Sequence, residues 1–145
     1  MKIFNKKAGF DYQLSDERLE AGISLKGMEA RALREGHGNI SQSHVRILGK
    51  EAFLVNANVP AKGVQNYNPT RIRKLLLRRQ QIIALMTKMK QEKLAIVPVK
   101  LYNKGRLIKI EIALGKPKRK FQKKESIKKR DIEREVAQEI KNKGT

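Results

Sequence analysis

The stretch from Asn68 to Met89, NPTRIRKLLLRRQQIIALMTKM, combines a long apolar run with a cluster of cations. Asn68 is suited to cap a helix, because its side chain can accept from the free backbone N–H groups of the first turn. Pro69 suits the first helical position, where a missing N–H costs nothing. The apolar positions recur at helical spacing, and three basic residues share another face. We therefore expect a helix that packs on a core through Ile72, Leu75, Leu76, Ile83 and Met86 and presents Arg71, Lys74 and Arg78 to an acidic partner.

Arg79 does not fit one straight helix, because it would lie among the apolar positions. Its stem could run along the edge of the core and keep the charge in water, or the segment could bend. We expect a bend between Leu77 and Gln80, which would give two shorter helices. The alternative for the whole stretch is a core helix with a solvated basic back.

The composition favours a polyanionic partner. The 145 residues carry 34 Lys and Arg against 14 Asp and Glu, a net charge of +20. Such a chain repels itself, so nucleic acid is the natural partner and an anionic membrane surface is the second candidate. No apolar run approaches the length of a membrane span, and the start does not read as a signal peptide. With no cysteine, a disulfide scaffold and a thiolate metal site are both excluded, and we expect a cytoplasmic protein.

The charge predicts a body and a tail. Residues 1–115 carry a net +13, and residues 116–145 carry +7 in a much shorter length. We place a domain boundary near Gly115 to Pro117, between a folded domain, 1–115, and a basic tail, 116–145. The first part of the tail, 116–124, has Phe121 as its one apolar residue and no reason to fold alone. Residues 126–140 could form a helix, which would be marginal in water and is expected mainly on a partner.

The body reads as mainly β. Short runs of β-branched and alternating residues are bounded by glycine, asparagine and proline, which is typical of a small closed or nearly closed barrel with peripheral helices. Gly22 indicates a bulge or a close backbone approach, Gly49-Lys50 a hairpin turn, and Pro98 an edge or bulged strand. The expected strands are 10–14, 18–25, 43–48, 51–56, 94–101 and 106–114, with a helix at 28–35.

The sequence offers few residues in arrangements that are typical of catalytic sites. Its two histidines, His37 and His44, have no third metal ligand at a fixed spacing. No nucleophile elbow, phosphate-binding loop or paired carboxylates are present. We therefore expect no enzyme, no metal and no cofactor. Nucleic-acid binding is better supported, because cations neutralise phosphates and aromatic rings stack on bases. The candidate rings are Tyr12, Tyr67, Tyr102 and Phe121.

Several motifs follow one another along the chain in a fixed order. They are Asn5-Lys6-Lys7-Ala8, Tyr12, Glu20-Ala21-Gly22-Ile23 with Leu25, Gly27-Met28-Glu29, Leu33-Arg34-Glu35-Gly36, Asn39-Ile40, Glu51-Ala52-Phe53, Pro69-Thr70-Arg71-Ile72-Arg73-Lys74-Leu75-Leu76-Leu77 and Ser126-Ile127-Lys128-Lys129-Arg130-Asp131. With these motifs the chain resembles the SmpB family, the tmRNA-binding (SsrA-binding) proteins of trans-translation, almost from end to end.

The resemblance implies an oligonucleotide-binding (OB) type β-barrel and an RNA-binding adaptor without catalytic activity. Family members bind the tRNA-like domain of tmRNA and accompany it into the vacant A site of a stalled ribosome. Their tail is disordered when free and helical in the empty mRNA channel, where it reaches the decoding centre of the small subunit. The implied partners are therefore tmRNA, the ribosome and, indirectly through aminoacylated tmRNA, elongation factor Tu. We expect a monomer with no membrane partner.

The resemblance also suggests which residues contact RNA. Asn5 and Glu20 match family positions associated with tmRNA contact. Glu20 could accept from base amines or orient a cation such as Lys6 or Lys7, and an internal salt bridge is its alternative role. Charge and position add Lys26, Arg34, Arg71, Arg73 and Lys74. In the tail, the candidates for ribosome contact are Lys118, Arg119, Phe121, Lys123, Lys124, Ile127, Lys128 and Arg130.

The chain departs from the family pattern in two places. Where the family reads G-T-E-V-K-S-L-R, residues 27–34 read GMEARALR, so two hydroxyls are gone. In the tail, Pro117, Phe121 and Gln122 replace residues of the family's G-K-K-x-Y-D-K-R. We expect these changes to leave tmRNA binding intact. The function that they put in question is the contact of the tail with the decoding centre. The rival functions are a basic ribosomal or ribosome-assembly protein with a similar barrel, and an RNA-processing enzyme.

Overall fold

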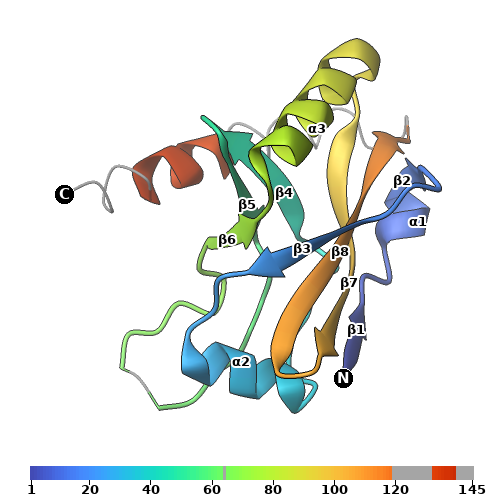
Figure 1. Cartoon of the computed structure of the whole chain (residues 1–145). Helices are drawn as coiled ribbons and strands as arrows, with labels where there is room; N and C mark the ends of the chain where they lie inside the picture. Colours follow the sequence, from blue (N-terminus) through green and yellow to red (C-terminus); the bar gives the residue numbers. More distant parts are fainter. Residues whose placement is uncertain (64, 119–131, 140–145) are drawn as a thin grey trace.

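The computed structural model describes residues 1–63, 65–118 and 132–139, and it contains a closed antiparallel barrel (Figure 1). The strand order is β1-β7-β4-β5-β6-β3-β8-β2, and a further pairing of β7 with β8 closes a ring of six strands. Short strands β1 and β2 extend β7 and β8 beyond the ring. The expected mainly β barrel with peripheral helices is confirmed. The elements are β1 Lys2–Phe4, α1 Ala8–Asp11, β2 Tyr12–Leu14, β3 Leu19–Ile23, α2 Gly27–Arg34, β4 His44–Leu48, β5 Glu51–Val55, β6 Arg73–Leu76, α3 Arg79–Glu92, β7 Ala95–Lys104 and β8 Leu107–Pro117.

The residues 68–78 form no helix, so this prediction was wrong. Arg73–Leu76 is strand β6, which lies between β5 and β3 and pairs with both. Asn68 caps a turn instead of a helix, since its Oδ1 accepts from the Thr70 backbone N–H at 3.1 Å. Pairing along both edges of β6 satisfies more backbone N–H and C=O groups than a single helical turn would. In a strand, successive side chains point to opposite faces of the sheet, so the pattern of buried residues has a period of two. Arg71, Lys74 and Arg78 therefore share no helix face.

Helix α3 begins only at Arg79, the position where we expected a bend. Its buried residues are Ile82 and Leu85, whereas Ile83, predicted to face the core, is 52% exposed. Arg79 is exposed at the first helical position, so its stem has no core edge to follow. The expected strand at 10–14 is also shorter, because Phe10 belongs to α1 and β2 starts at Tyr12.

Local signals in the other strands predicted the structure correctly. Gly49, at φ 62°, starts the turn between β4 and β5. The register of β7 and β8 shifts between Pro98 and Lys100, so Pro98 marks a bulge, and β7 is paired on both sides. A Cβ on Gly22 would lie 3.2 Å from the Leu76 Cβ, which is the close approach expected there.

Residues 132–139 form a helix that packs on the outer surface of the barrel (Figure 1). Its Val136 is fully buried in a small cluster with Phe53, Val55 and Ile72. We expected this helix to form on a partner; here the barrel of the same chain supplies the apolar surface. Within the described ranges, no helix is long and apolar enough to cross a membrane.

Candidate RNA-binding surface

A buried ion-pair network joins α2 to β6. Glu29 and Arg73 are both 0% exposed. Arg73 Nε donates to Glu29 Oε2 at 2.9 Å, and Arg71 Nη2 donates to Glu29 Oε1 at 2.6 Å. The Tyr67 hydroxyl donates to Oε2 at 2.9 Å. Because a buried charge is costly unless it is paired, these four side chains depend on one another.

All the N–H groups of the Arg73 guanidinium donate hydrogen bonds to acceptors within the protein. Besides Glu29, its N–H groups donate to the Tyr67 hydroxyl and to the carbonyls of Ala57, Pro69 and Arg71, at 2.8 to 3.0 Å. These acceptors match the five donors of a guanidinium, so none remains for RNA. The sequence-based assignment of Arg73 to RNA binding is therefore corrected: it is a structural cation.

The other members of the network are also engaged. Arg71, another residue assigned to RNA binding from the sequence, has a side chain only 18% exposed and pairs with Glu29. The hydroxyl of Tyr67, a candidate stacking ring, is held by Glu29 and Arg73. Burial alone would raise the pKa of Glu29, but hydrogen bonds from Arg71, the Lys26 backbone and Arg73 outweigh it and lower that pKa to about 2.

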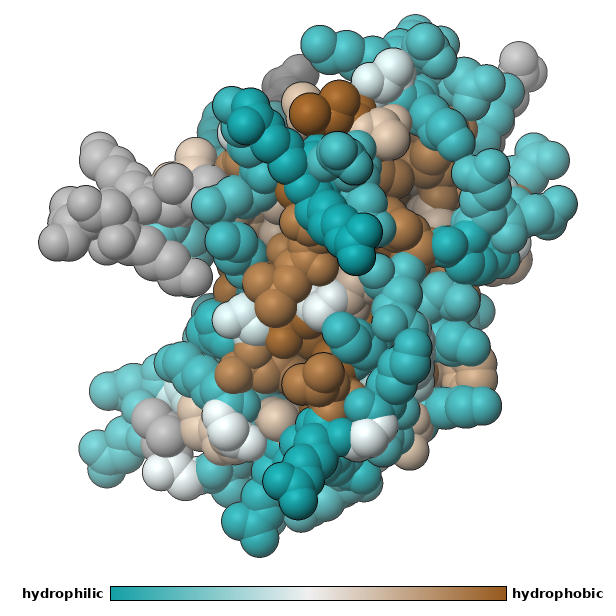
Figure 2. Space-filling model, viewed as in Figure 1, coloured by the Kyte–Doolittle hydropathy of each residue, from teal (hydrophilic) through white to brown (hydrophobic). Residues whose placement is uncertain are grey.

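An open cleft of about 790 Å³ lies where β3, β6 and the start of α3 meet the β4–β5 turn. Figure 2 shows an apolar area on this side of the molecule, between α3 and α2, bordered by hydrophilic residues. Leu76, 57% exposed, lines the cleft. The positive end of α3 also opens there and adds to the potential of the side chains. The cations that line the cleft come from four parts of the fold and are Lys50, Lys74, Arg78, Arg79 and Lys109.

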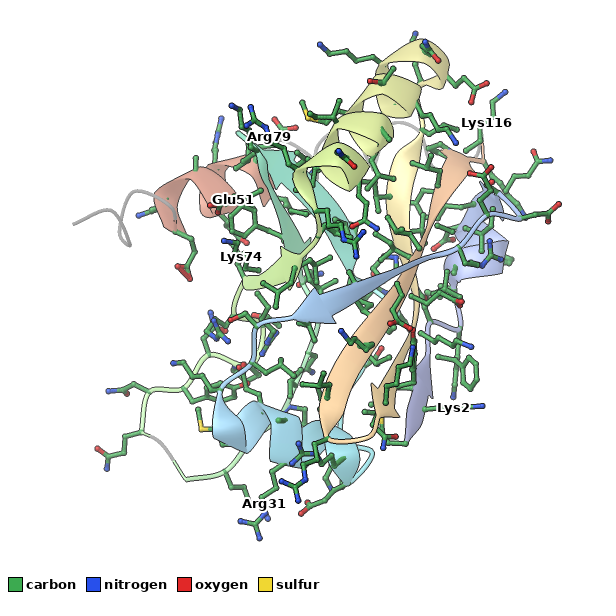
Figure 3. All side chains as sticks on the ribbon, viewed as in Figure 1. Lys2, Arg31, Glu51, Lys74, Arg79 and Lys116 are labelled. Carbon is green, nitrogen blue, oxygen red and sulfur yellow. The ribbon has the colours of Figure 1, made fainter. Side chains whose placement is uncertain are left out.

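This arrangement suits a ligand that carries phosphates and an apolar face. Cations at the rim neutralise phosphate, and an exposed leucine offers contact to a base or sugar. Figure 3 shows Lys74 and Arg79 on the same side of the molecule, with Glu51 near them. Lys74 Nζ lies 3.5 Å from Glu51 Oε1, both exposed to solvent, so this pair is weak and exchangeable.

Glu20 lies at the edge of the same cleft and is held by Tyr102. The Tyr102 hydroxyl donates to Glu20 Oε2, and this hydrogen bond is the main reason that the pKa of Glu20 is lowered. Lys104 Nζ lies 3.6 Å from the other oxygen, and Lys109 contributes a favourable charge. The internal salt bridge considered for Glu20 is therefore present, and its cation is Lys104 and not Lys6 or Lys7.

The remaining residues assigned from the sequence lie elsewhere on the barrel. Asn5 is occupied locally: its Nδ2 donates to the Pro98 carbonyl at 2.7 Å, and its Oδ1 accepts from the Lys7 backbone at 3.1 Å. Arg34, on α2, donates to the Arg106 carbonyl at 2.8 Å. The structure thus brings Glu20 and Lys74 to one cleft, whereas Asn5, Lys6 and Lys7 lie beside α1, Lys26 is the N-cap of α2 and Arg34 is its last residue.

Sequence reasoning missed several cations of the cleft. Lys50 was seen only as a turn residue. Arg78 was expected to meet an acidic partner, but from a helix face that does not exist, and Arg79 was expected at a bend, with the core edge as its alternative. Lys109 had a usable signal, because the alternation of β8 puts it on the outer face. No local signal connects four separate segments of the chain to one cleft.

Of the tail residues assigned to the ribosome, Lys118 is described. Its backbone N–H donates to the Asp11 carbonyl and its Nζ to the Gly9 carbonyl, both at 3.1 Å. Strand β8 also continues through Pro117, so the sheet includes the first two residues after Gly115. Arg119, Phe121, Lys123, Lys124, Ile127, Lys128 and Arg130 lie outside the described residues.

Neither histidine belongs to a metal-binding group. Within residues 1–63, 65–118 and 132–139, no three His, Asp or Glu side chains cluster as ligands would. His37 is exposed, with its Nε2 3.7 Å from Glu35 Oε2, and His44 starts β4.

Comparisons with known proteins cover the chain almost completely. A family model described as "SmpB protein" matches residues 2–142. The SsrA-binding protein of Mesoplasma florum is 45% identical over 141 residues, covering 94% of this chain and 94% of the relative. The SsrA-binding protein of Thermosipho africanus is 44% identical, covering 97% and 98%. A solved structure described as "tmRNA-SmpB: a journey to the center of the bacterial ribosome" has a TM-score of 0.66 and 34% identity, covering 81% of this chain and 85% of that chain.

Proposed function

This chain belongs to the SmpB family, and we propose that it is an RNA-binding adaptor of trans-translation. It binds the tRNA-like domain of tmRNA and delivers it to the A site of a stalled ribosome. The observation that carries this function is the extent of the likeness: identities of 44–45% with SsrA-binding proteins extend over nearly the full length of both chains. The solved structure that the barrel resembles is of a tmRNA-SmpB complex.

The cleft between β3, β6 and α3 is the proposed contact with tmRNA. Its cations, Lys50, Lys74, Arg78, Arg79 and Lys109, neutralise phosphates, and Leu76 packs on an exposed base or sugar. Glu20 fixes the position of Tyr102 and Lys104 at its edge. A carboxylate repels phosphate, so its use in an RNA interface requires such neighbouring cations.

The tail carries the ribosomal part of the function in this proposal. Residues 1–115 form the RNA-binding body, and residues 116–145 enter the empty mRNA channel and reach the decoding centre. The protein acts in the cytoplasm as a monomer, without catalysis or cofactor, and meets elongation factor Tu through aminoacylated tmRNA. Lys118 is held against α1 by its hydrogen bonds to the carbonyls of Gly9 and Asp11, so the tail leaves the body from this point.

The test is a competition titration. Labelled tRNA-like domain of tmRNA is bound to the full chain at two salt concentrations, with bulk tRNA in excess. We expect binding that resists the competitor at both concentrations. Equal and steeply salt-dependent binding to every RNA would show a polycation without specificity and would overturn the function.

Two double variants locate the contact. Arg79→Ala with Lys109→Ala removes two cleft cations, whereas Lys88→Ala with Lys90→Ala removes the same charge from the distal half of α3. Each lost phosphate contact should flatten the dependence of log K on log salt by about 0.9, so the cleft variant should lose about 1.8. The α3 variant should keep the slope of the unmodified chain. Equal effects of the two variants would mean that the cleft is not the contact.

A further inference from the structure

Gly22 lies in the floor of the cleft, between two of the residues that line it. In the register of the barrel, Gly22 on β3 pairs with Leu76 on β6 and with Lys109 on β8. All three residues line the cleft. Ala21 and Ile23, the neighbours of Gly22 in β3, are buried in the main core, so position 22 faces outward. A ligand that contacts both Leu76 and Lys109 therefore crosses Gly22.

The backbone conformation does not require a glycine at this position. Among the described residues, the glycines with a positive φ are Gly36, Gly49, Gly63 and Gly105, and Gly22 is not one of them. Inside a strand, glycine is unfavourable, because it loses more conformational freedom on folding than other residues and has no side chain to pack. The advantage of glycine at position 22 therefore comes from the space around it.

Leu76 occupies that space. A Cβ on Gly22 would lie 3.2 Å from the Cβ of Leu76, 3.3 Å from its Cδ1 and 3.5 Å from its Cγ. The best separation of two carbon atoms is about 3.5–4.0 Å, so all three distances are at or below it. Three atoms of the leucine side chain therefore lie directly over the β3 backbone, where any other residue would place its own Cβ.

Leu76 is exposed to solvent and is nevertheless held on one side. It is 57% exposed, so most of its surface is available to a ligand. An exposed leucine without neighbours populates several rotamers, and it loses this freedom when a ligand packs on it. Contact with the β3 backbone removes part of that freedom before the ligand arrives. A side chain that is ordered in advance lowers the entropic cost of binding.

We propose that Gly22 is a positioning residue for RNA binding: because it has no side chain, Leu76 lies on β3 in one orientation and presents its exposed side to a base or sugar of the RNA. This inference rests on the proposed function of the cleft, and it adds a residue that acts through Leu76. A larger residue at position 22 fills the same space and displaces Leu76. It also stands between Leu76 and Lys109, which a ligand then reaches less easily together.

The first test measures the contact in the free protein by NMR. One α proton of Gly22 stands where a Cβ would be, so it lies close to Leu76 Cδ1. We expect an NOE between this proton and a Leu76 methyl group, and different ¹³C shifts for the two Leu76 methyl carbons, as one rotamer gives. Gly22→Val should bring the two shifts together, because the leucine then averages over rotamers. Absence of the NOE, or averaged shifts in the unmodified chain, would overturn the inference.

The second test measures the affinity of the full chain for the tRNA-like domain of tmRNA. Gly22→Val and Leu76→Ala should each lower this affinity about tenfold, the loss expected for one apolar side-chain contact. The dependence of log K on log salt should stay that of the unmodified chain, because no cation is changed. The double variant should bind no more weakly than Leu76→Ala alone, since both substitutions remove the same contact. Additive losses would show that Gly22 acts independently of Leu76 and would overturn the inference.

A milder variant and a matched control complete the binding test. Gly22→Ala should lower the affinity less than Gly22→Val, because a small shift of Leu76 accommodates a single Cβ, and it decides the outcome if Gly22→Val does not fold in a urea titration. Gly9→Val should bind as the unmodified chain does, since a Cβ on Gly9 has nothing within 4 Å and Gly9 does not line the cleft. Unchanged affinity of the folded Gly22 variants would overturn the inference. If the unmodified chain does not prefer the tRNA-like domain to bulk tRNA, the proposed function itself fails, which separates the two outcomes.

Discussion

Replacing Glu29 by Gln tests whether the buried network holds α2 to the barrel. The substitution removes the carboxylate that accepts from Arg71, Arg73 and Tyr67 while keeping nearly the same volume. Arg73, 0% exposed, would keep its charge without a counter-ion. Removing one partner of a buried ion pair costs about 3–5 kcal/mol. A domain of this size has a total stability of about 5–15 kcal/mol, so the loss should be easy to measure.

The pKa of Glu29 gives a second measure of the same interaction. It is lowered from 4.5 to about 2, and each pKa unit corresponds to about 1.4 kcal/mol. The folded state therefore gains about 3 kcal/mol from the ionised carboxylate above pH 4.5, and this gain is lost as the pH falls toward 2. The free energy of unfolding of the unmodified chain should fall through this window by about 3 kcal/mol more than that of Glu29→Gln.

The assay is urea unfolding followed by circular dichroism, at neutral pH and at several values between pH 4.5 and 2. The control is Glu35→Gln, because the pairs that Glu35 makes, with Arg31 at 3.6 Å and with His37 at 3.7 Å, are both exposed, so the substitution should change stability by less than about 0.5 kcal/mol. A loss below about 1 kcal/mol for Glu29→Gln, or the same pH dependence as the unmodified chain, would refute the reasoning. In that case Arg73 would be stabilised by its carbonyl acceptors alone.

Two further predictions concern single contacts. Gly38→Ala should lower the free energy of unfolding by about 1–3 kcal/mol in the same urea assay, because a Cβ would lie 2.6 Å from Leu33 Cδ2. Gly9→Ala, where a Cβ has nothing within 4 Å, is its control, and equal losses would contradict the packing argument. Tyr102→Phe should raise the pKa of Glu20 toward its usual value, because the hydrogen bond that lowers it is gone. A carboxyl titration followed by NMR measures this shift, and an unchanged pKa would show that Lys104 and Lys109 suffice.

The sequence determined the family, the fold class and several local features by itself. The run of residues 69–77 and the EAG motif at 20–22 are long enough to carry the resemblance. The alternation in β8, the positive φ at Gly49 and the bulge at Pro98 follow from side-chain and backbone chemistry that acts over a few residues. Such effects need no partner elsewhere in the chain, so they can be predicted from the sequence alone.

The tertiary structure decided what the cations do. A short segment such as Ile72 to Leu77, in which Arg73 and Lys74 interrupt the apolar residues, fits a helix or a buried strand equally well by periodicity, and pairing with β3 and β5 chose the strand. That choice turned Arg73 inward to Glu29, 44 residues away, and left Lys74 facing the cleft. The sequence records each charge but not its distance from a carboxylate on another element. Only the closed barrel, which brings four separated segments together, distinguishes a buried structural arginine from one that can meet RNA.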